Sequence, residues 1–259
     1  MERVRDLIQP YLTREGVVGI YVVGSATRPF RDGLSDYDIE VVVTDEVYDR
    51  TPDDERHILV IEEGPPRRVD HEFYLWPWRD FTALRDSDQD LFHFAYQHAA
   101  ILHDPEGRIA AIVSKLAELP DIVREQRMRV HFLEFIYGSG RARKTLERGS
   151  TLNVRMVLAA AVRALVKLLF LQHGSWAPTL HWSEQELREL GIPVDLITQM
   201  TGLLADPTED ALRGLVERVK ARLTEREETF HDDVAALDRW AFLTAEGKRA
   251  FARWGSGSG

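Results

Sequence analysis

The sequence contains no cysteine among its 259 residues. This excludes disulfides, thiolate catalysis and cysteine-based metal sites, so a metal site must use oxygen or imidazole ligands. No apolar run approaches the ~20 residues that are needed to cross a bilayer. The first six residues, Met1 to Asp6, lack the apolar core of a secretory signal peptide. We therefore expect a soluble, cytoplasmic protein.

Positive charge is also in the minority, with 33 basic against 43 acidic residues and a formal net charge of -10. Proteins that follow nucleic acid by neutralising phosphates carry basic surfaces, so this class is disfavoured. A small or cationic substrate fits better, although an acidic balance also serves solubility alone. The length allows one large domain or two ordinary ones with a real core.

Apolar periodicity predicts mixed secondary structure in the first half of the chain. We expect strands at 17–23, from Asp36 onward, at 57–62 and at 69–75, a loop at 44–56, a short apolar element at 100–102, and helices at 2–14, 78–86, 90–100 and 106–119. The last two strands are separated by a Gly-Pro-Pro turn and predict a hairpin.

From Pro120 onward the pattern is helical throughout, and Asp121 is predicted to cap the first of these helices. The expected helices are 122–148, 152–171, 183–190, 194–204, 208–228 and 232–254, the last interrupted near 244–247. Ser183 with Glu186, and Thr208, give further cap signals. The predicted fold is α+β: a small mixed β-sheet flanked by helices in a domain at 1–120, then an all-α helical-bundle domain at 121–259. Its Gly/Ser end, 255–259, predicts a flexible tail.

The first candidate functional residues lie where the first predicted strand ends and the second begins. Gly24-Ser25 ends the first strand, and Asp36 and Asp38 occupy alternate positions at the start of the second. Alternate strand residues share a face, so the two carboxylates lie side by side and repel unless a divalent cation binds them. A glycine turn lets the backbone approach a phosphate, although most Gly-Ser pairs are only turns. Together the two elements indicate a metal that bridges a triphosphate.

A third acidic element lies at Asp70 and Glu72, which share one face of the predicted strand 69–75. If this strand lies beside the Asp36 strand, three or four carboxylates converge. Alternating acids often decorate a solvated sheet face, but the upstream motif favours the metal interpretation. His71 is expected to face the opposite side.

These residues resemble the signature of the polymerase-β-like nucleotidyltransferases, and within them most of all the aminoglycoside enzymes such as kanamycin nucleotidyltransferase. The matching residues are Gly24, Ser25, Arg28, Asp32-Gly33, Ser35, Asp36 and Asp38, then Val69-Asp70 with Phe73-Tyr74. The resemblance also covers the overall length and the order of a mixed-sheet domain and a helical one.

The resemblance implies a role for each matching position. Gly24 and Ser25 would hold the β- and γ-phosphates of a nucleotide, with Arg28 near the leaving pyrophosphate and Ser35 counted among the nucleotide-binding residues. Asp36 and Asp38 would ligate Mg²⁺, with Asp70 as the third carboxylate. Glu72 stands where the aminoglycoside enzymes tend to carry a neutral polar residue, and its role stays open.

The resemblance also implies a glutamate base on the first long helix of the second domain, followed one turn later by a phosphate-binding lysine. The aligned position holds Tyr137, which is a poor base at neutral pH. Glu134 lies three residues earlier on the same helix face and would take the catalytic role; the alternatives are surface exposure and a structural pair with Arg129 or Arg141. Arg141 would replace the lysine, with Lys144 a turn further on.

The sequence thus predicts an enzyme that transfers a nucleoside monophosphate from an NTP, with ATP preferred, to a hydroxyl of a small molecule. Mg²⁺ is the expected cofactor, pyrophosphate the product, and an aminoglycoside antibiotic a candidate acceptor, which would give antibiotic resistance. The alternatives are transfer to a protein or to a tRNA end, and a non-catalytic nucleotide-binding module. A homodimer is suggested by the resemblance alone, and neither a membrane nor nucleic acid is an expected partner.

Overall fold

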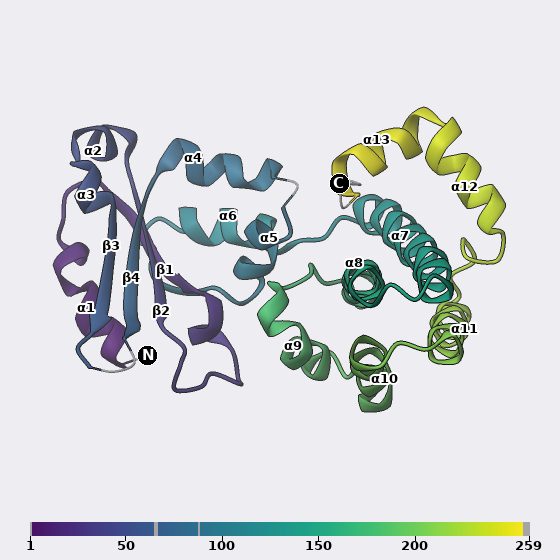
Figure 1. The fold of residues 1–259 in the computed structure, drawn as a ribbon. Helices are drawn as coiled ribbons and strands as arrows, with labels where there is room; N and C mark the ends of the chain where they lie inside the picture. Colours follow the sequence, from purple (N-terminus) through teal and green to yellow (C-terminus); the bar gives the residue numbers. More distant parts are fainter. Residues whose placement is uncertain (1, 65–66, 88, 256–259) are drawn as a thin grey trace. The chain divides into compact units, whose positions relative to one another are not determined.

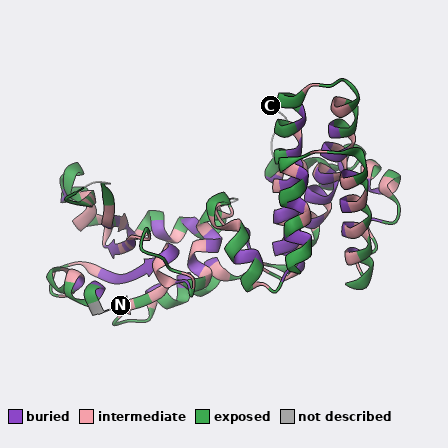
Figure 2. Cartoon of the chain, turned by 60° about the horizontal axis from the view of Figure 1, so that its bottom comes forward, coloured by how far each residue is buried: buried purple, intermediate pink, exposed green. Residues whose placement is uncertain are grey.

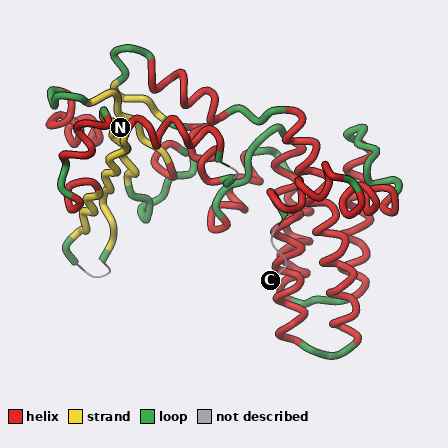
Figure 3. The backbone as a smooth tube through the Cα atoms, turned by 90° about the horizontal axis from the view of Figure 1, so that it is seen from above, coloured by secondary structure: helices red, strands yellow, loops and turns green. Residues whose placement is uncertain are grey.

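The computed structural model describes residues 2–64, 67–87 and 89–255. The chain divides into two compact units, residues 1–118 and 119–259 (Figure 1). The strands all belong to the first unit, and the second is built from helices (Figure 3). This is the predicted α+β fold. No helix in the described part of the chain is long and apolar enough to cross a membrane.

The first unit is organised around a five-stranded mixed sheet with the strand order β3-β4-β2-β1-β5. The strands are β1 (Val17–Val23), β2 (Tyr37–Val43), β3 (His57–Glu62), β4 (Arg68–Pro77) and β5 (Ala100–His103). β2 and β4 run parallel, and the other neighbouring pairs are antiparallel. β5 contains the short apolar element expected at 100–102, and it forms the edge of the sheet beside β1.

Two apolar cores cover the two faces of this sheet. On one face, α1 (Glu2–Leu12) packs Val4 and Ile8 against the odd-numbered residues of β2, from Tyr37 to Val43. On the other face, α4 (Trp78–Ala83) and α6 (Arg108–Ala117) cover β1 and the far end of β2. Buried residues therefore follow the central strands (Figure 2). Because side chains alternate along a strand, the acidic residues of β2 lie on the α6 side of the sheet.

The segment 44–56 is helical, which corrects the prediction of a loop. It forms α2 (Asp45–Arg50) and α3 (Asp53–Arg56). In both short helices acidic residues occupy the first turn and an arginine occupies the last turn. This arrangement opposes the helix dipole at both ends, so the acids that suggested a loop stabilise helix starts. Further on, the longer helices that we expected at 78–86 and 90–100 are shorter in the structure: α5 spans Leu91–Phe94, and the segments Leu84–Asp86 and Ala95–His98 are 3₁₀ turns.

The second unit is built on two long helices, α7 (Asp121–Glu147) and α8 (Thr151–Gln172), which pack along one another. Gly138 of α7 sits against Ala161 of α8, where a Cβ on the glycine would lie 2.7 Å from the alanine Cβ. The remaining helices are α9 (Ser183–Glu189), α10 (Val194–Ala205), α11 (Glu209–Glu225), α12 (Val234–Leu243) and α13 (Ala245–Trp254).

The predicted helix caps have mixed outcomes. Thr208 caps α11 as expected, because its hydroxyl accepts a hydrogen bond from the Ala211 amide at 3.2 Å. Asp121 is the first residue of α7 and not its cap, since Pro120 holds the cap position. A 3₁₀ turn at Leu180–Trp182 precedes Ser183, which therefore begins α9 without capping it. Of the predicted tail, residues 256–259 lie outside the described part of the chain.

Candidate active site

The turn after β1 brings the backbone against an acidic side chain of β2. Gly24 opens a short 3₁₀ segment, Gly24–Thr27, with a φ of +71°. A Cβ at this position would lie 2.1 Å from the Asp38 Oδ2. Both the left-handed backbone and the close approach require glycine. The turn is held by Thr27, whose hydroxyl donates to the Gly24 carbonyl at 2.9 Å, and Ser25 is buried within it.

Three carboxylates converge beside this turn. One oxygen each from Asp36, Asp38 and Glu72 lies within 4.8 Å of the other two. The sheet register explains the meeting, because Asp38 of β2 and Glu72 of β4 are direct partners in the parallel pair. Asp36 stands two residues before Asp38, on the same face. All three side chains are half-buried, so they are accessible to an ion from one side.

This arrangement perturbs the central carboxyl strongly. The pKa of Asp38 rises from 3.8 to about 7, first because burial disfavours its charge and then because Asp36, Glu72 and Glu40 repel it. Hydrogen bonds do not stabilise the negative charge of this pair, because Asp36 and Asp38 accept none from the described residues. A divalent cation with oxygen ligands is the group that relieves such repulsion.

Glu40 lies two residues further along β2, and hydroxyl groups satisfy its carboxylate. Tyr21 donates to it in a short hydrogen bond, and Tyr96 donates at 3.0 Å. Burial raises the pKa of Glu40, and these hydrogen bonds oppose the rise. The pKa values of both tyrosines lie well above 10.0, because of their burial and the nearby carboxylate. Glu40 is therefore a fourth acid on this face with partners of its own.

Glu72 is oriented by the outer strand of the sheet. His57 of β3 binds its carboxylate in a short hydrogen bond. The same imidazole stacks on Tyr74 with ring centroids 4.2 Å apart and planes inclined by 12°. The strand next to the acids thus fixes the third carboxylate through a stacked histidine.

Asp70, the predicted third metal ligand, is placed elsewhere by a β-bulge. The β3–β4 register shifts so that Val60 pairs with His71 and Ile61 pairs with Val69, which leaves Asp70 as the extra residue. Its carboxylate accepts from Arg3 at 2.5 Å and contacts the His71 Nδ1 at 2.7 Å. The structure therefore brings Glu72, and not Asp70, to Asp36 and Asp38. The alternation of the two acids was visible in the sequence, but the bulge that separates them was not.

The remaining predicted nucleotide-binding residues of this unit lie around the same turn and the following loop. Arg28 is buried, with its guanidinium 4.3 Å from the centre of the Phe94 ring. Ser35 donates its hydroxyl to Asp32 at 2.9 Å, which closes the loop before Asp36. A polar pocket of about 150 Å³ lies at this loop, and Arg31 and Arg68 are among the residues that line it.

Glu134, the predicted base, lies on α7 in the second unit. Its carboxylate accepts from the His131 Nδ1 at 2.8 Å, and burial lowers the pKa of this fully buried histidine. Arg129, one of the two partners considered for Glu134, instead binds Glu125 at 2.5 Å. Arg141 and Lys144 are exposed near the end of α7. The structure thus gives Glu134 a histidine partner that sequence spacing alone did not single out, although the i, i+3 relation was available.

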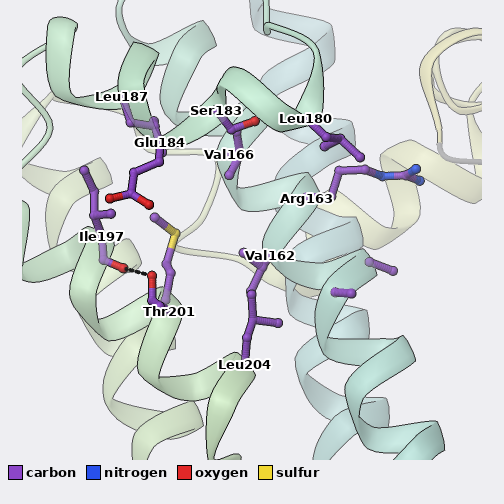
Figure 4. A pocket seen from close by; sticks show the side chains of 13 residues that line it. Val162, Arg163, Val166, Leu180, Ser183, Glu184, Leu187, Ile197, Thr201 and Leu204 are labelled. Carbon is purple, nitrogen blue, oxygen red and sulfur yellow. Dashed lines mark hydrogen bonds between the residues drawn. The ribbon is translucent and has the colours of Figure 1, made fainter. Parts of the chain in front are cut away.

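The second unit also contains a cavity of about 500 Å³ between α8, α9 and α10 (Figure 4). Leucine, valine, isoleucine and alanine side chains form most of its lining. Its carboxylate, Glu184, is exposed and pairs with Arg188 at 2.7 Å. Thr201 in the wall donates to the Ile197 carbonyl at 3.0 Å, within its own helix. This lining offers apolar contact without a cluster of acids.

Parts of the chain are similar to known proteins. Residues 84–183 match a family model described as a domain of unknown function, DUF4037. A comparison with curated protein sequences gives no match. Among solved structures, the chain is similar to a nucleotidyltransferase-like protein from Exiguobacterium sibiricum 255-15, with a TM-score of 0.48 and 16% identity over 98% of this chain and 86% of that one.

Proposed function

We propose that the protein is a Mg²⁺-dependent nucleotidyltransferase, which moves a nucleoside monophosphate from an NTP to a hydroxyl group and releases pyrophosphate. One observation carries the proposal: the carboxylates of Asp36, Asp38 and Glu72 converge next to the glycine turn. A set of hard oxygen donors beside a glycine turn at which the backbone can approach a phosphate is a combination that suits metal-assisted phosphoryl transfer.

The residues present fit a divalent cation. Three carboxylate oxygens within 4.8 Å of one another give the ligand type that Mg²⁺ prefers and lie close enough to converge on one ion. Burial and repulsion from Asp36, Glu72 and Glu40 raise the pKa of Asp38, and a bound cation would offset that repulsion. Asp36, Asp38 and Glu72 would hold the ion, and when bound it supplies positive charge against the phosphate oxygens.

The chain's own groups would position the reactants. Gly24 and Ser25 offer the backbone of a short turn to the β- and γ-phosphates, and the glycine adds no side chain of its own at this position. We assign Arg28 and Ser35 to the phosphate side of this turn. His57 holds the carboxylate of Glu72 in place, which keeps the donor set organised before substrate arrives.

In the second unit we propose Glu134 as the group that accepts the proton of the attacking hydroxyl. His131 Nδ1 donates to this carboxylate at 2.8 Å and holds it in one orientation. Arg141 and Lys144 are proposed to bind phosphate oxygens. ATP is the expected nucleotide, and aminoglycosides belong in the first acceptor panel because of the sequence resemblance.

The proposal is tested by incubating the protein with Mg²⁺, α-labelled ATP and an acceptor panel, and measuring both label transfer and pyrophosphate. We expect transfer by the wild type and none by Asp38→Asn, with Gly202→Ala on α10 as a control because nothing lies within 4 Å of its added methyl. Label that appears on a protein or on tRNA would identify the alternative acceptors. Tight Mg²⁺-ATP binding with no transfer to any acceptor would refute catalysis and leave a nucleotide-binding module.

A further inference from the structure

One row of residues crosses four strands of the sheet at the acidic site. In the register, Asp38 of β2 pairs with Val23 of β1 on one side and with Glu72 of β4 on the other. Glu72 in turn pairs with Leu59 of β3. The glycine turn therefore lies at the β1 end of this row, the carboxylates in the middle, and Leu59 at the β3 end.

If the proposed function is right, this order of residues indicates from which side the acceptor hydroxyl approaches and toward which side pyrophosphate leaves. In an in-line displacement the attacking and leaving oxygens lie on opposite sides of the phosphorus atom. If the β- and γ-phosphates bind at Gly24–Ser25, pyrophosphate leaves toward β1. The attacking hydroxyl must then arrive from the side of β4 and β3.

The surface on that side is apolar and exposed. Leu59, Ile61 and Tyr74 have exposed fractions of 46%, 45% and 38%. Alternation along β3 puts Leu59 and Ile61 on one face, and the pairing of Leu59 with Glu72 shows that this is the face of the acids. Tyr74 follows Glu72 by two residues on the same face. We call these three side chains the β3–β4 platform.

The platform is within reach of the metal-binding carboxylates for a small molecule. Neighbouring strands lie about 4.8 Å apart, so Leu59 is one strand from Glu72 and two strands, about 10 Å, from Asp38. The stacked pair of His57 and Tyr74 gives this surface a flat, fixed edge. A ring or chain that rests on Leu59 and Tyr74 would therefore present its hydroxyl beside the acids.

We propose that the β3–β4 platform binds the acceptor and that the acceptor is an alcohol or phenol with an apolar body. Exposed leucine, isoleucine and tyrosine side chains gain by covering an apolar surface, whereas they offer no charge to a polycationic sugar. The acceptor class is therefore set by β3, an edge strand that carries none of the three converging carboxylates.

Binding and transfer are tested separately with 2-naphthol as the probe. We expect Leu59→Ser and Ile61→Ser each to weaken 2-naphthol binding to the Mg²⁺-loaded protein by about tenfold, as measured by fluorescence titration. Leu91→Ser on α5 is the matched control, since Leu91 has an exposed fraction of 48% in the same unit. Equal affinities for the Leu59 and Leu91 variants would overturn the platform assignment.

In the transfer assay with Mg²⁺-ATP, the expected result is a tenfold higher KM for 2-naphthol in Leu59→Ser with little change in kcat. Transfer that Leu59→Ser does not affect overturns the platform and leaves the proposed function standing. No transfer to any acceptor, with the wild type equal to Asp38→Asn, instead defeats the proposed function and with it the acceptor role. A dimer in sedimentation that Leu59→Ser dissociates, while Leu91→Ser does not, would show that the platform joins two copies and would also overturn the proposal.

Discussion

Replacing Asp38 by asparagine tests the electrostatics of the site without any assumption about the acceptor. The side chain keeps its size and loses its charge, so repulsion from Asp36, Glu72 and Glu40 disappears. We expect Asp38→Asn to make the metal-free protein more stable at pH 8 and, at the same time, unable to respond to Mg²⁺. Replacing a carboxylate that neither is repelled by its neighbours nor binds Mg²⁺ would change neither the stability at pH 8 nor the response to Mg²⁺.

The magnitude follows from the pKa. A rise from 3.8 to about 7 is about 3 pKa units, and each unit corresponds to about 1.4 kcal/mol. The limit is therefore about 4 kcal/mol, and because Asp38 is only half-buried, solvent screening reduces the expected gain to the order of 2 kcal/mol. The sign is fixed by linkage. A carboxyl whose pKa is raised on folding makes the native state lose stability as pH rises from about 4 to about 7.

Thermal unfolding in EDTA at pH 5 and at pH 8 measures this directly, with Asp54→Asn on exposed α3 as the control. The variant should exceed the wild type by a small margin at pH 5 and by a larger one at pH 8, where Asp38 of the wild type is charged in the folded state as well. Adding Mg²⁺ at pH 8 should raise the midpoint of the wild type and leave that of Asp38→Asn unchanged, since a ligand stabilises only the state that binds it. A stability difference that is the same at both pH values would refute the reasoning.

Three further variants test the packing around the site and in the second unit. Gly24→Ala should lose Mg²⁺ binding and roughly 1–3 kcal/mol of stability, because its methyl meets Asp38 at a φ of +71°; Gly33→Ala should do neither in the same calorimetric titration. Gly138→Ala should cost about 1–3 kcal/mol in urea unfolding through its contact with Ala161, whereas Gly140→Ala, in open space on the same helix, should gain up to about 1 kcal/mol. Tyr96→Phe should cost about 1–3 kcal/mol by removing a hydrogen bond to Glu40, and a loss no larger than that of Tyr48→Phe would contradict this role.

Much of the fold could be predicted because apolar periodicity is a local property. The apolar run of β1, the alternation at the start of β2 and the long helical pattern of α7 and α8 all follow burial, which the sequence records directly. The prediction of a loop at 44–56 was wrong because it relied on composition. The acids of this segment favour a loop by composition, yet they stabilise helix starts when they stand in the first turn, and six residues are too few to show a helical period.

The features of the site that depend on one strand alone could be predicted from the sequence. The turn at Gly24 and the alternation of Asp36 with Asp38 each depend on neighbours in the chain, and both are present in the structure. The third carboxylate depends on pairing between strands, because one extra residue in β4 moves Asp70 out of line and leaves Glu72 opposite Asp38. Likewise, the partner of Glu134 was one of several residues at helical spacing, and only the packing of α7 selects His131.

The carboxylates around this sheet differ in what satisfies their charge, and this difference separates structural acids from those that need a ligand. Asp70 is bound by Arg3 and His71, and Glu40 accepts hydrogen bonds from two tyrosines. Asp36 and Asp38 accept none from the described residues, although they are half-buried and lie close together. The fold thus provides hydrogen-bond donors for some of these acids and, within the described part of the chain, none for the adjacent pair Asp36 and Asp38. Negative charge is therefore left unbalanced at this pair. Because that place adjoins the glycine turn, a cation bound there would also face whatever anion the turn binds, which is the geometry of a nucleotide–metal site.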